Sequence, residues 1–245
     1  MADERDAVDA PTSLMRVLVR VTRLHDACRA DPSLAKGLQR LGEWQSRRLR
    51  NTYADLAVDP RYTAAIAFFQ NDLYGGTDFS RRDADLARVG PKMVRLLPEK
   101  VISTVAHAIE LNALSHELDR ALLARLPCPD AAFTVAEYCQ AYREADEYPL
   151  RKQQLALICE VGGALDRYVR TPMVGAALTM MRQPARLAGF SALQDFLERG
   201  FAAFRRMNGA AQFLDIIAMR EAQLHEAIVA GGDDPFPDPW PTPRT

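Results

Sequence analysis

The spacing of apolar residues between Thr12 and Ala230 constrains the fold more than any other feature of this sequence. Leu14, Leu18 and Val21 begin a pattern in which apolar side chains recur every three or four positions, the period of one helix face. No segment alternates apolar and polar residues convincingly, as a half-buried strand would. The pattern therefore predicts an all-α fold.

Prolines divide this pattern into segments, because proline begins or ends a helix more readily than it continues one. The predicted helices are residues 13–28, 33–57, 61–74, 80–89, 99–126, 134–147, 150–170, 172–181, 191–207 and 210–230, with a short element between Pro91 and Pro98. Ser80, Thr134 and Ser191 each precede Asp, Glu or Gln by three residues and predict helix caps. Since no repeat of fixed period is present, we expect a single bundle of about eight to ten helices rather than a solenoid.

The two ends of the chain differ from the helical domain, which is predicted at residues 13–230. Residues 1–12 start with an acidic stretch that lacks the apolar segment of a secretory signal, and we expect a flexible N-terminus. In residues 231–245, proline occupies every second position from Pro235 to Pro243, which excludes a helix or a central strand. We expect an extended or disordered tail. Docking of Phe236 and Trp240 on the body or on a partner is the alternative.

Composition narrows the class of protein further. The 31 basic and 32 acidic side chains nearly cancel, so bulk charge does not predict nucleic-acid binding. Apolar residues make up 48% of the chain, too many for a disordered protein, yet no run reaches the roughly 18 residues of a membrane span. The four cysteines, Cys28, Cys128, Cys139 and Cys159, are widely spaced. We expect them to be reduced thiols in a cytoplasmic protein.

Several ionisable residues fall on helix faces that should be buried, where an unpaired charge is costly. Glu221 and His225 lie one turn apart on the apolar face of residues 210–230. In residues 99–126, Glu110 and Glu117 share one stripe, and His107 lies one turn before Glu110. The predicted inward polar cluster comprises Gln45, Arg48, Asp72, Glu110, Glu117, Glu221 and His225.

Three interpretations of this cluster remain open. Carboxylates and histidines inside a bundle can hold two iron or manganese ions for oxygen chemistry, with His107, Glu110, Glu117, Glu221 and His225 as candidate ligands. The usual Glu-x-x-His signature is not met, because Glu221 and His225 are one residue too far apart. The second interpretation is an internal network in which Arg48 bridges carboxylates. The third is a pocket whose polar groups orient the head of an apolar molecule.

The segment Phe68-Phe69-Gln70-Asn71-Asp72-Leu73-Tyr74 resembles the peptide that names a bacterial family, the FFLEELY-motif proteins. The resemblance extends to Trp44-Gln45, Arg48-Leu49 and Arg220-Glu221, among other segments, and so covers most of the chain. The sequence departs from the motif at Gln70 and Asn71, and Asp72 replaces its second Glu. The resemblance implies a bacterial cytoplasmic protein built as one unit, and it carries over no catalytic residue.

The sequence therefore predicts a protein that acts by binding a partner protein or an apolar small molecule. No cofactor is predicted, and homo-oligomerisation is left open. The alternative function is a dinuclear iron or manganese oxidase or oxygenase whose metal ions are bridged by carboxylates and histidine. A purely structural scaffold, with a large apolar surface patch and no pocket, is a third hypothesis.

Overall fold

The computed structural model describes residues 9–73, 85, 88–89, 98–127 and 132–239. Within these residues the chain forms ten α-helices, one π-helical turn and no strand, which confirms the all-α prediction. The elements are α1 (Ala10–Ala30), α2 (Pro32–Thr52), α3 (Ala54–Val58), α4 (Thr63–Phe68), the π-helical turn η1 (Phe69–Leu73), α6 (Glu99–Leu123), α7 (Val135–Ala145), α8 (Tyr148–Val169), α9 (Pro172–Leu187), α10 (Ser191–Met207) and α11 (Ala211–Val229). Over the same residues, no helix is long and apolar enough to cross a membrane.

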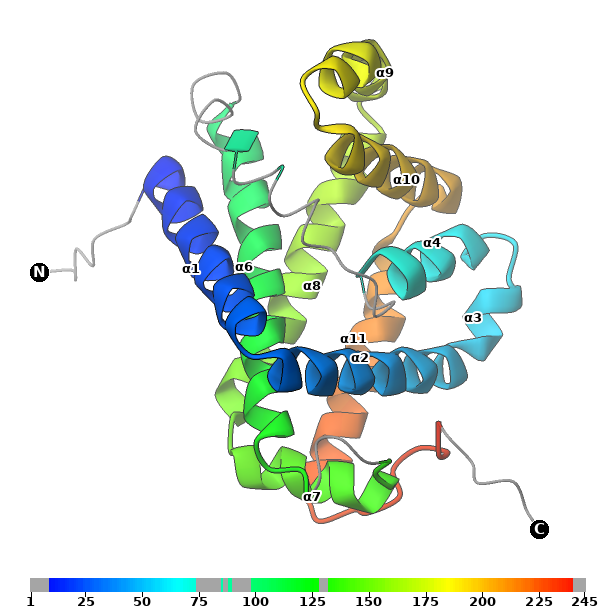
Figure 1. The fold of residues 1–245 in the computed structure, drawn as a ribbon. Coiled ribbons are helices and arrows are strands. Elements are labelled where there is room, and N and C mark those ends of the chain that lie inside the picture. The colour runs from blue at the N-terminus through cyan, green and yellow to red at the C-terminus, as the bar shows by residue number, and fades with distance from the viewer. Residues whose placement is uncertain (1–8, 74–84, 86–87, 90–97, 128–131, 240–245) are drawn as a thin grey trace, which may run out of the picture.

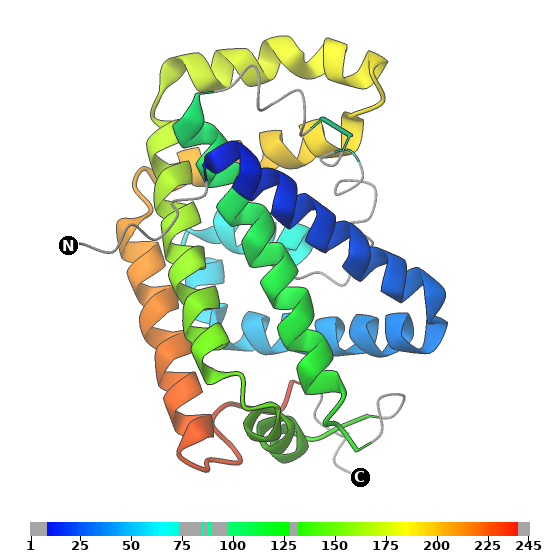
Figure 2. The same ribbon diagram turned by 90° about the vertical axis from the view of Figure 1, so that its left-hand side faces the viewer.

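Helices α1, α6, α8 and α11 lie side by side in that order and form the body of the bundle (Figure 2). Helix α2 crosses this row, α7 closes one end, and α4, α10 and α9 stack at the other end (Figure 1). Helices α8 and α11 run in opposite directions and approach closely at Gly162, where a Cβ would lie 2.5 Å from Cδ2 of Leu214. The middle of the molecule is therefore enclosed by α2, α6, α8 and α11.

Capping residues set several helix ends. Asp31 caps α2, since its carboxylate accepts backbone N–H groups of Ser33 and Leu34. Thr134 and Glu137 form the predicted capping box at α7.

The predicted cap at Ser191 is wrong, because Phe190 precedes α10 without a side-chain cap. Gln194 instead donates hydrogen bonds of 2.7 Å to the carbonyl of Leu178 and to Glu198. The side-chain amide of Gln194, which the motif predicted to cap α10, therefore helps to pack α10 against α9. Ser80 lies outside the described residues.

Other helix boundaries differ from the prediction for local reasons. Helix α1 begins at Ala10 rather than residue 13, because Asp9 accepts the backbone N–H of Thr12 and caps the helix. Residues 33–57 form two helices separated at Tyr53, and the segment from 61 forms α4 followed by η1. Helix α9 continues through Pro184 to Leu187 instead of ending at residue 181. The predicted elements at 80–89 and 91–98 lie mostly outside the described residues.

The part of the C-terminal tail that the structure describes packs against the body. Phe236 is buried, and its ring centroid lies 5.8 Å from that of Trp44 and 6.1 Å from that of Tyr138. The guanidinium of Arg48 lies 5.9 Å from the same ring centroid. Of the two predicted alternatives, the structure therefore favours docking for Phe236. Trp240 lies outside the described residues.

Candidate functional site

A cavity of about 330 Å³, which we call the central cavity, lies between α2, α4, α6, α7, α8 and α11 together with η1. Its apolar wall residues include Leu49, Ile66, Phe69, Leu155, Ile158, Phe213 and Ile217, and its polar ones include Gln45, Arg48, Tyr53, Ser115, Asp119, Tyr138, Tyr142, Arg151, Glu221 and His225. On α11, Phe213 and Ile217 precede Glu221 and His225. On the oppositely directed α8, Arg151 precedes the apolar wall residues. The cavity wall therefore changes from apolar to polar along this helix pair.

Arg48 and Glu221 form an ion pair in the polar wall. Nη1 and Nη2 of Arg48 donate to the two carboxylate oxygens of Glu221 at 2.5 and 2.9 Å, and the Tyr53 hydroxyl donates at 2.7 Å. The two charged side chains are only 13% and 23% exposed. Burial disfavours both charges, but their attraction outweighs it, so the pKa of Arg48 is raised and that of Glu221 is lowered. Both groups are charged at neutral pH.

Asp119 of α6 lies in the same wall and is absent from the predicted cluster. Gln45 donates through Nε2 to its Oδ1 at 3.0 Å. Burial raises the pKa of Asp119, although the charge of Arg151 and the Gln45 hydrogen bond act in the opposite direction. Its carboxyl group is therefore much less stabilised in the charged form than that of Glu221.

A third group of polar residues joins α7, α8 and α11. The Tyr142 hydroxyl lies 2.7 Å from Nδ1 of His225, and the guanidinium of Arg151 lies 4.9 Å from the Tyr142 ring centroid. Burial, reinforced by the charges of Lys152 and Arg151, lowers the pKa of His225. The imidazole is therefore neutral at neutral pH and pairs with the tyrosine as a neutral hydrogen-bonding group.

The structure brings together only part of the predicted cluster. Gln45, Arg48, Glu221 and His225 line the cavity. Asp72 instead accepts Nε and Nη2 of Arg199, on α10, at 2.9 and 2.6 Å.

The predicted residues of α6 also have partners elsewhere. Glu117 pairs with Arg20 of α1, with 2.6 Å between Nε and Oε1. Glu110 accepts Nε2 of Gln153 at 3.2 Å. These carboxylates are therefore engaged by α1 and α8 on other sides of α6.

The candidate metal ligands are likewise separated. His107 contacts Glu160, with 2.7 Å between Nδ1 and Oε1, and does not join Glu221 or His225 in the cavity wall. In the part of the chain that the structure describes, no group of three or more His, Cys, Asp and Glu residues is placed to hold a metal ion. The geometry thus offers no support for a dinuclear centre among these residues.

Sequence reasoning missed Asp119, Arg151 and the tyrosines of the wall. Helix α6 is apolar on nearly every side, so its pattern does not show which stripe faces the cavity. The stripe that does so carries Ser115 and Asp119, four residues apart. Tyr138 and Tyr142 have the same spacing on α7, which could have marked a shared face. The π-helical turn adds Phe69 and Gln70, and such turns are frequent at functional sites.

A wider hollow of about 1010 Å³ lies between α8, α9 and α10. Two of its arginines already have partners, since Arg182 pairs with Glu198 and Arg170 with Asp166. The central cavity combines an apolar wall with convergent polar groups, and is therefore the stronger candidate site.

Residues 24–235 match a protein family described as a domain of unknown function, DUF8198. The matched region contains every residue that lines the central cavity. No curated protein and no solved structure matches the chain significantly. The chain belongs to the DUF8198 family.

Proposed function

We propose that this protein binds a small amphipathic molecule in the central cavity, with a carboxylate head at the polar end and a hydrocarbon body at the apolar end. The observation that carries the proposal is the position of Arg151, a positively charged residue in the polar part of the cavity wall. An enclosed apolar pocket with a few convergent polar groups is the usual form of a small-molecule site.

Cavity size limits the ligand. Its volume of about 330 Å³ is near the lower end of the range for small-molecule sites. A water molecule occupies about 30 Å³ in the liquid, so the cavity accommodates roughly ten non-hydrogen atoms. A medium-chain fatty acid has this size.

The two arginines of the wall differ in what they can still bind. Arg48 is neutralised by Glu221 through two hydrogen bonds. Arg151 stacks on Tyr142 and donates one long hydrogen bond, 3.4 Å from Nη2 to the carbonyl of Leu118, and it forms no ion pair within the described residues. Since a guanidinium binds a carboxylate through two parallel hydrogen bonds, Arg151 is the group that supports an anionic head.

Octanoate, which has ten non-hydrogen atoms, tests the proposal against 1-octanol, which has the same chain without the charge. We expect octanoate to raise the thermal unfolding temperature and to bind measurably by calorimetry, and 1-octanol to bind more weakly. Arg151→Gln should remove the preference for octanoate but retain binding of the alcohol. Arg167→Gln is the matched control, because Arg167 is an exposed arginine of the same helix that does not line the cavity.

Filling the cavity tests the site separately from the head group. Ala222 lines the cavity from α11, and Ala222→Phe should abolish binding of both compounds. If neither compound binds the native protein, the proposed function is wrong. If both compounds bind equally well and Arg151→Gln changes neither affinity, the cavity is still a binding site, but the proposed preference for a carboxylate head group is wrong.

The proposal also includes the kind of organism and the cellular compartment. The resemblance of residues 68–74 to the FFLEELY peptide supports a bacterial protein that meets its ligand in the cytoplasm. Cell fractionation of the native host tests this, and recovery outside the cytoplasm would contradict it.

A further inference from the structure

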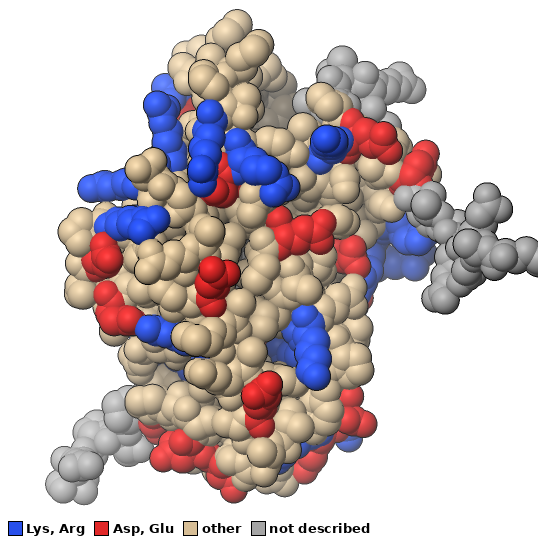
Figure 3. Space-filling view, turned by 180° about the vertical axis from the view of Figure 1, so that it is seen from behind, with Lys and Arg blue, Asp and Glu red and all other residues tan. Residues whose placement is uncertain are grey.

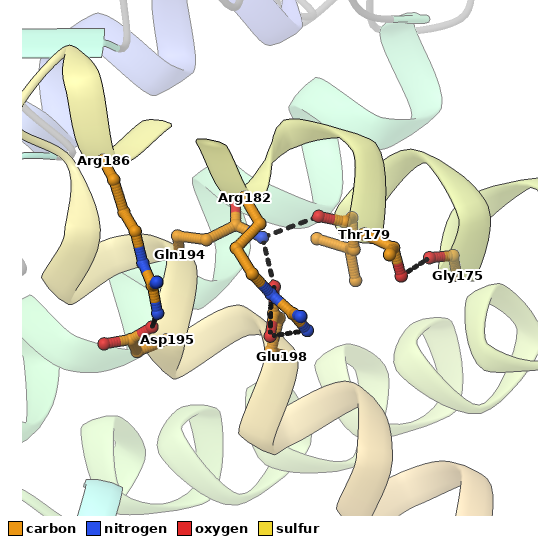
Figure 4. A network of polar contacts seen from close by, with 8 residues as sticks. Gly175, Thr179, Arg182, Arg186, Gln194, Asp195 and Glu198 are labelled. Carbon is orange, nitrogen blue, oxygen red and sulfur yellow. Dashed lines mark hydrogen bonds and ion pairs between the residues drawn. The ribbon is translucent and has the colours of Figure 1, made fainter. Parts of the chain in front are cut away.

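Many charged side chains at the surface lie close to groups of opposite charge. On the face of the molecule seen in Figure 3, Asp and Glu lie among Lys and Arg over the middle and lower parts. Between α9 and α10, Arg182 pairs with Glu198, and Gln194 donates to the same carboxylate at 2.7 Å (Figure 4). Arg186 lies 3.9 Å from Asp195 in the same view. These groups satisfy one another and leave little for a ligand to bind.

Several polar groups of the central cavity are likewise satisfied within its wall. Both carboxylate oxygens of Glu221 accept hydrogen bonds from Arg48. The Ser115 hydroxyl donates to the carbonyl of Leu111 and accepts from Nε2 of Gln154, both at 2.8 Å. These side chains are held by the protein itself, so a ligand head group has to bind elsewhere in the wall.

Asp119 is not satisfied in this way. Nε2 of Gln45 donates to its Oδ1 at 3.0 Å, but no other described residue donates a hydrogen bond to its Oδ2. A carboxyl group has two oxygens and can take part in several hydrogen bonds. Asp119 is half-buried and lines the cavity, so its remaining hydrogen-bonding capacity is open to a ligand.

The guanidinium of Arg151 lies next to Asp119. Its Nη2 donates at 3.4 Å to the carbonyl of Leu118, the residue that precedes Asp119 in α6. Burial raises the pKa of Asp119, and the charge of Arg151 opposes this effect. Among the described residues the two side chains nevertheless form no ion pair, and most N–H donors of Arg151 remain unused. The polar end of the cavity therefore offers an anion-binding group and a neighbouring carboxyl.

The charge of the cavity wall indicates the charge of the ligand. Because burial favours the neutral form of Asp119, the remaining charged side chains decide the balance. The three basic ones exceed the two acidic ones by one charge, and the set is Arg48, Arg151, Lys152, Glu221 and Glu226. Since charges in a protein interior are normally paired, a ligand with one negative charge and no positive charge fits this wall. An amino acid would bring an ammonium group and leave the excess in place.

We propose, on the basis of the proposed function, that the ligand of the central cavity is a hydroxy acid whose carboxylate binds Arg151 and whose hydroxyl group hydrogen-bonds Asp119. The hydroxyl lies about one or two carbons from the carboxylate, because Arg151 reaches the carbonyl of the residue next to Asp119. A hydroxyl can donate or accept, so it pairs with a carboxyl group in either protonation state. A site built to bind a hydroxyl discriminates against the analogue that lacks it.

A panel of eight-carbon acids tests this ligand class by calorimetry on the full-length protein. The better of 2-hydroxyoctanoate and 3-hydroxyoctanoate should bind about tenfold more tightly than octanoate, because it adds one hydrogen bond to a group of the site. The matched compound is 8-hydroxyoctanoate, which has the same composition but places its hydroxyl against the apolar wall, and it should bind more weakly than octanoate. The compound 2-aminooctanoate should bind more weakly than 2-hydroxyoctanoate.

Variants of Asp119 test which residue recognises the hydroxyl. Asp119→Ala should remove the preference for the hydroxy acid without weakening the binding of octanoate. Asp119→Asn should retain most of the preference, because an amide can both donate and accept. Glu110→Ala is the matched control, since Glu110 is a carboxylate of the same helix that accepts Nε2 of Gln153 at 3.2 Å and does not line the cavity. Thermal unfolding of each variant shows whether it is folded.

The results separate this ligand class from the proposed function. If octanoate binds and neither 2-hydroxyoctanoate nor 3-hydroxyoctanoate binds more tightly, the hydroxy acid is wrong while the carboxylate site stands. A preference for 2-aminooctanoate over both hydroxy acids overturns the charge argument, and so does a preference for the hydroxy acid that survives in Asp119→Ala. If no compound of the panel binds, the proposed function and the hydroxy acid are both wrong.

Discussion

The central cavity and α9 depart in opposite directions from the usual arrangement of apolar residues inside and polar residues outside. In the cavity wall, charged groups face inward, and Arg48 and Glu221 satisfy each other there. On α9, the two arginines lie on the side that faces α10 but are still 46% and 52% exposed. The outer face of α9, which carries Met173, Met180 and Leu187, is apolar and exposed. The first departure is compensated by an ion pair at Arg48 and Glu221, but Arg151 and Asp119 have only hydrogen bonds to uncharged groups among the described residues. The apolar side chains of the outer face stay exposed in the part of the chain that the structure describes.

The largest expected effect comes from breaking the compensation inside the cavity. Arg48→Ala leaves the buried carboxylate of Glu221 with the Tyr53 hydroxyl as its main partner. We expect a loss of about 2–3 kcal/mol in the free energy of unfolding, somewhat below the loss for a fully buried pair because Glu221 is 23% exposed. Urea unfolding followed by helicity measures it.

The matched control for this change is Arg20→Ala, which breaks an ion pair on the other side of α6. Arg20 and Glu117 are 35% and 34% exposed, so the pair contributes about 0.5 kcal/mol or less. If Arg48→Ala and Arg20→Ala lower the free energy of unfolding equally, the ion pair in the cavity wall stabilises the fold no more than a partly exposed one.

A smaller effect should distinguish the two carboxyl groups of the cavity wall by pH. Glu221 has a lowered pKa, so its stabilising effect is present above its ordinary value near 4.5 and is lost as pH falls through the folded value. Asp119 has a raised pKa, so its effect is favourable below its ordinary value near 3.8 and is lost as pH rises through the folded value. The groups facing Asp119 are Gln45, Arg151 and His116.

Glu221→Gln and Asp119→Asn should therefore show opposite pH dependence. Relative to the native protein, Glu221→Gln should become less stable as pH rises from about 4 to 7, whereas Asp119→Asn should become more stable. The amide of Asn can still accept the Gln45 hydrogen bond, so the fold should be preserved. Urea unfolding at several pH values measures both differences. A constant difference for Asp119→Asn across this range would show that Asp119 is an ordinary carboxylate.

The helical fold was predictable because it depends on local pattern. The spacing of Leu14, Leu18 and Val21 predicts α1, and Thr134 with Glu137 predicts the start of α7. Failures arose where tertiary contacts override local signals. At Ser191, the Gln194 amide binds α9 instead of completing a cap, and Pro184 lies inside α9 rather than beyond its end.

The site was predictable only where a helix has one apolar face. On α11, Glu221 and His225 interrupt a single apolar arc, and both line the cavity. Helix α6 has apolar residues on nearly all sides. The pattern therefore could not show whether the stripe of Glu110 and Glu117 or the stripe of Asp119 faces the cavity. Arg151 lies in the first turns of α8, where a cation is typical of a solvated helix end. Its contact with Tyr142 and its place in the cavity wall depend on tertiary packing that the sequence pattern does not show.

The smallest expected effect tests whether the outer face of α9 contributes to the fold of one chain. Met180→Gln should change the free energy of unfolding by less than about 0.5 kcal/mol, because Met180 is 76% exposed. Leu178→Gln, two residues earlier on the half-buried inner face, should cost about 1–2 kcal/mol. If the two variants are equally unstable, the outer face is covered within the chain and the contrast with the cavity disappears. If only Leu178→Gln is unstable, the fold of the chain depends on the side of α9 that packs against α10 and not on its outer face.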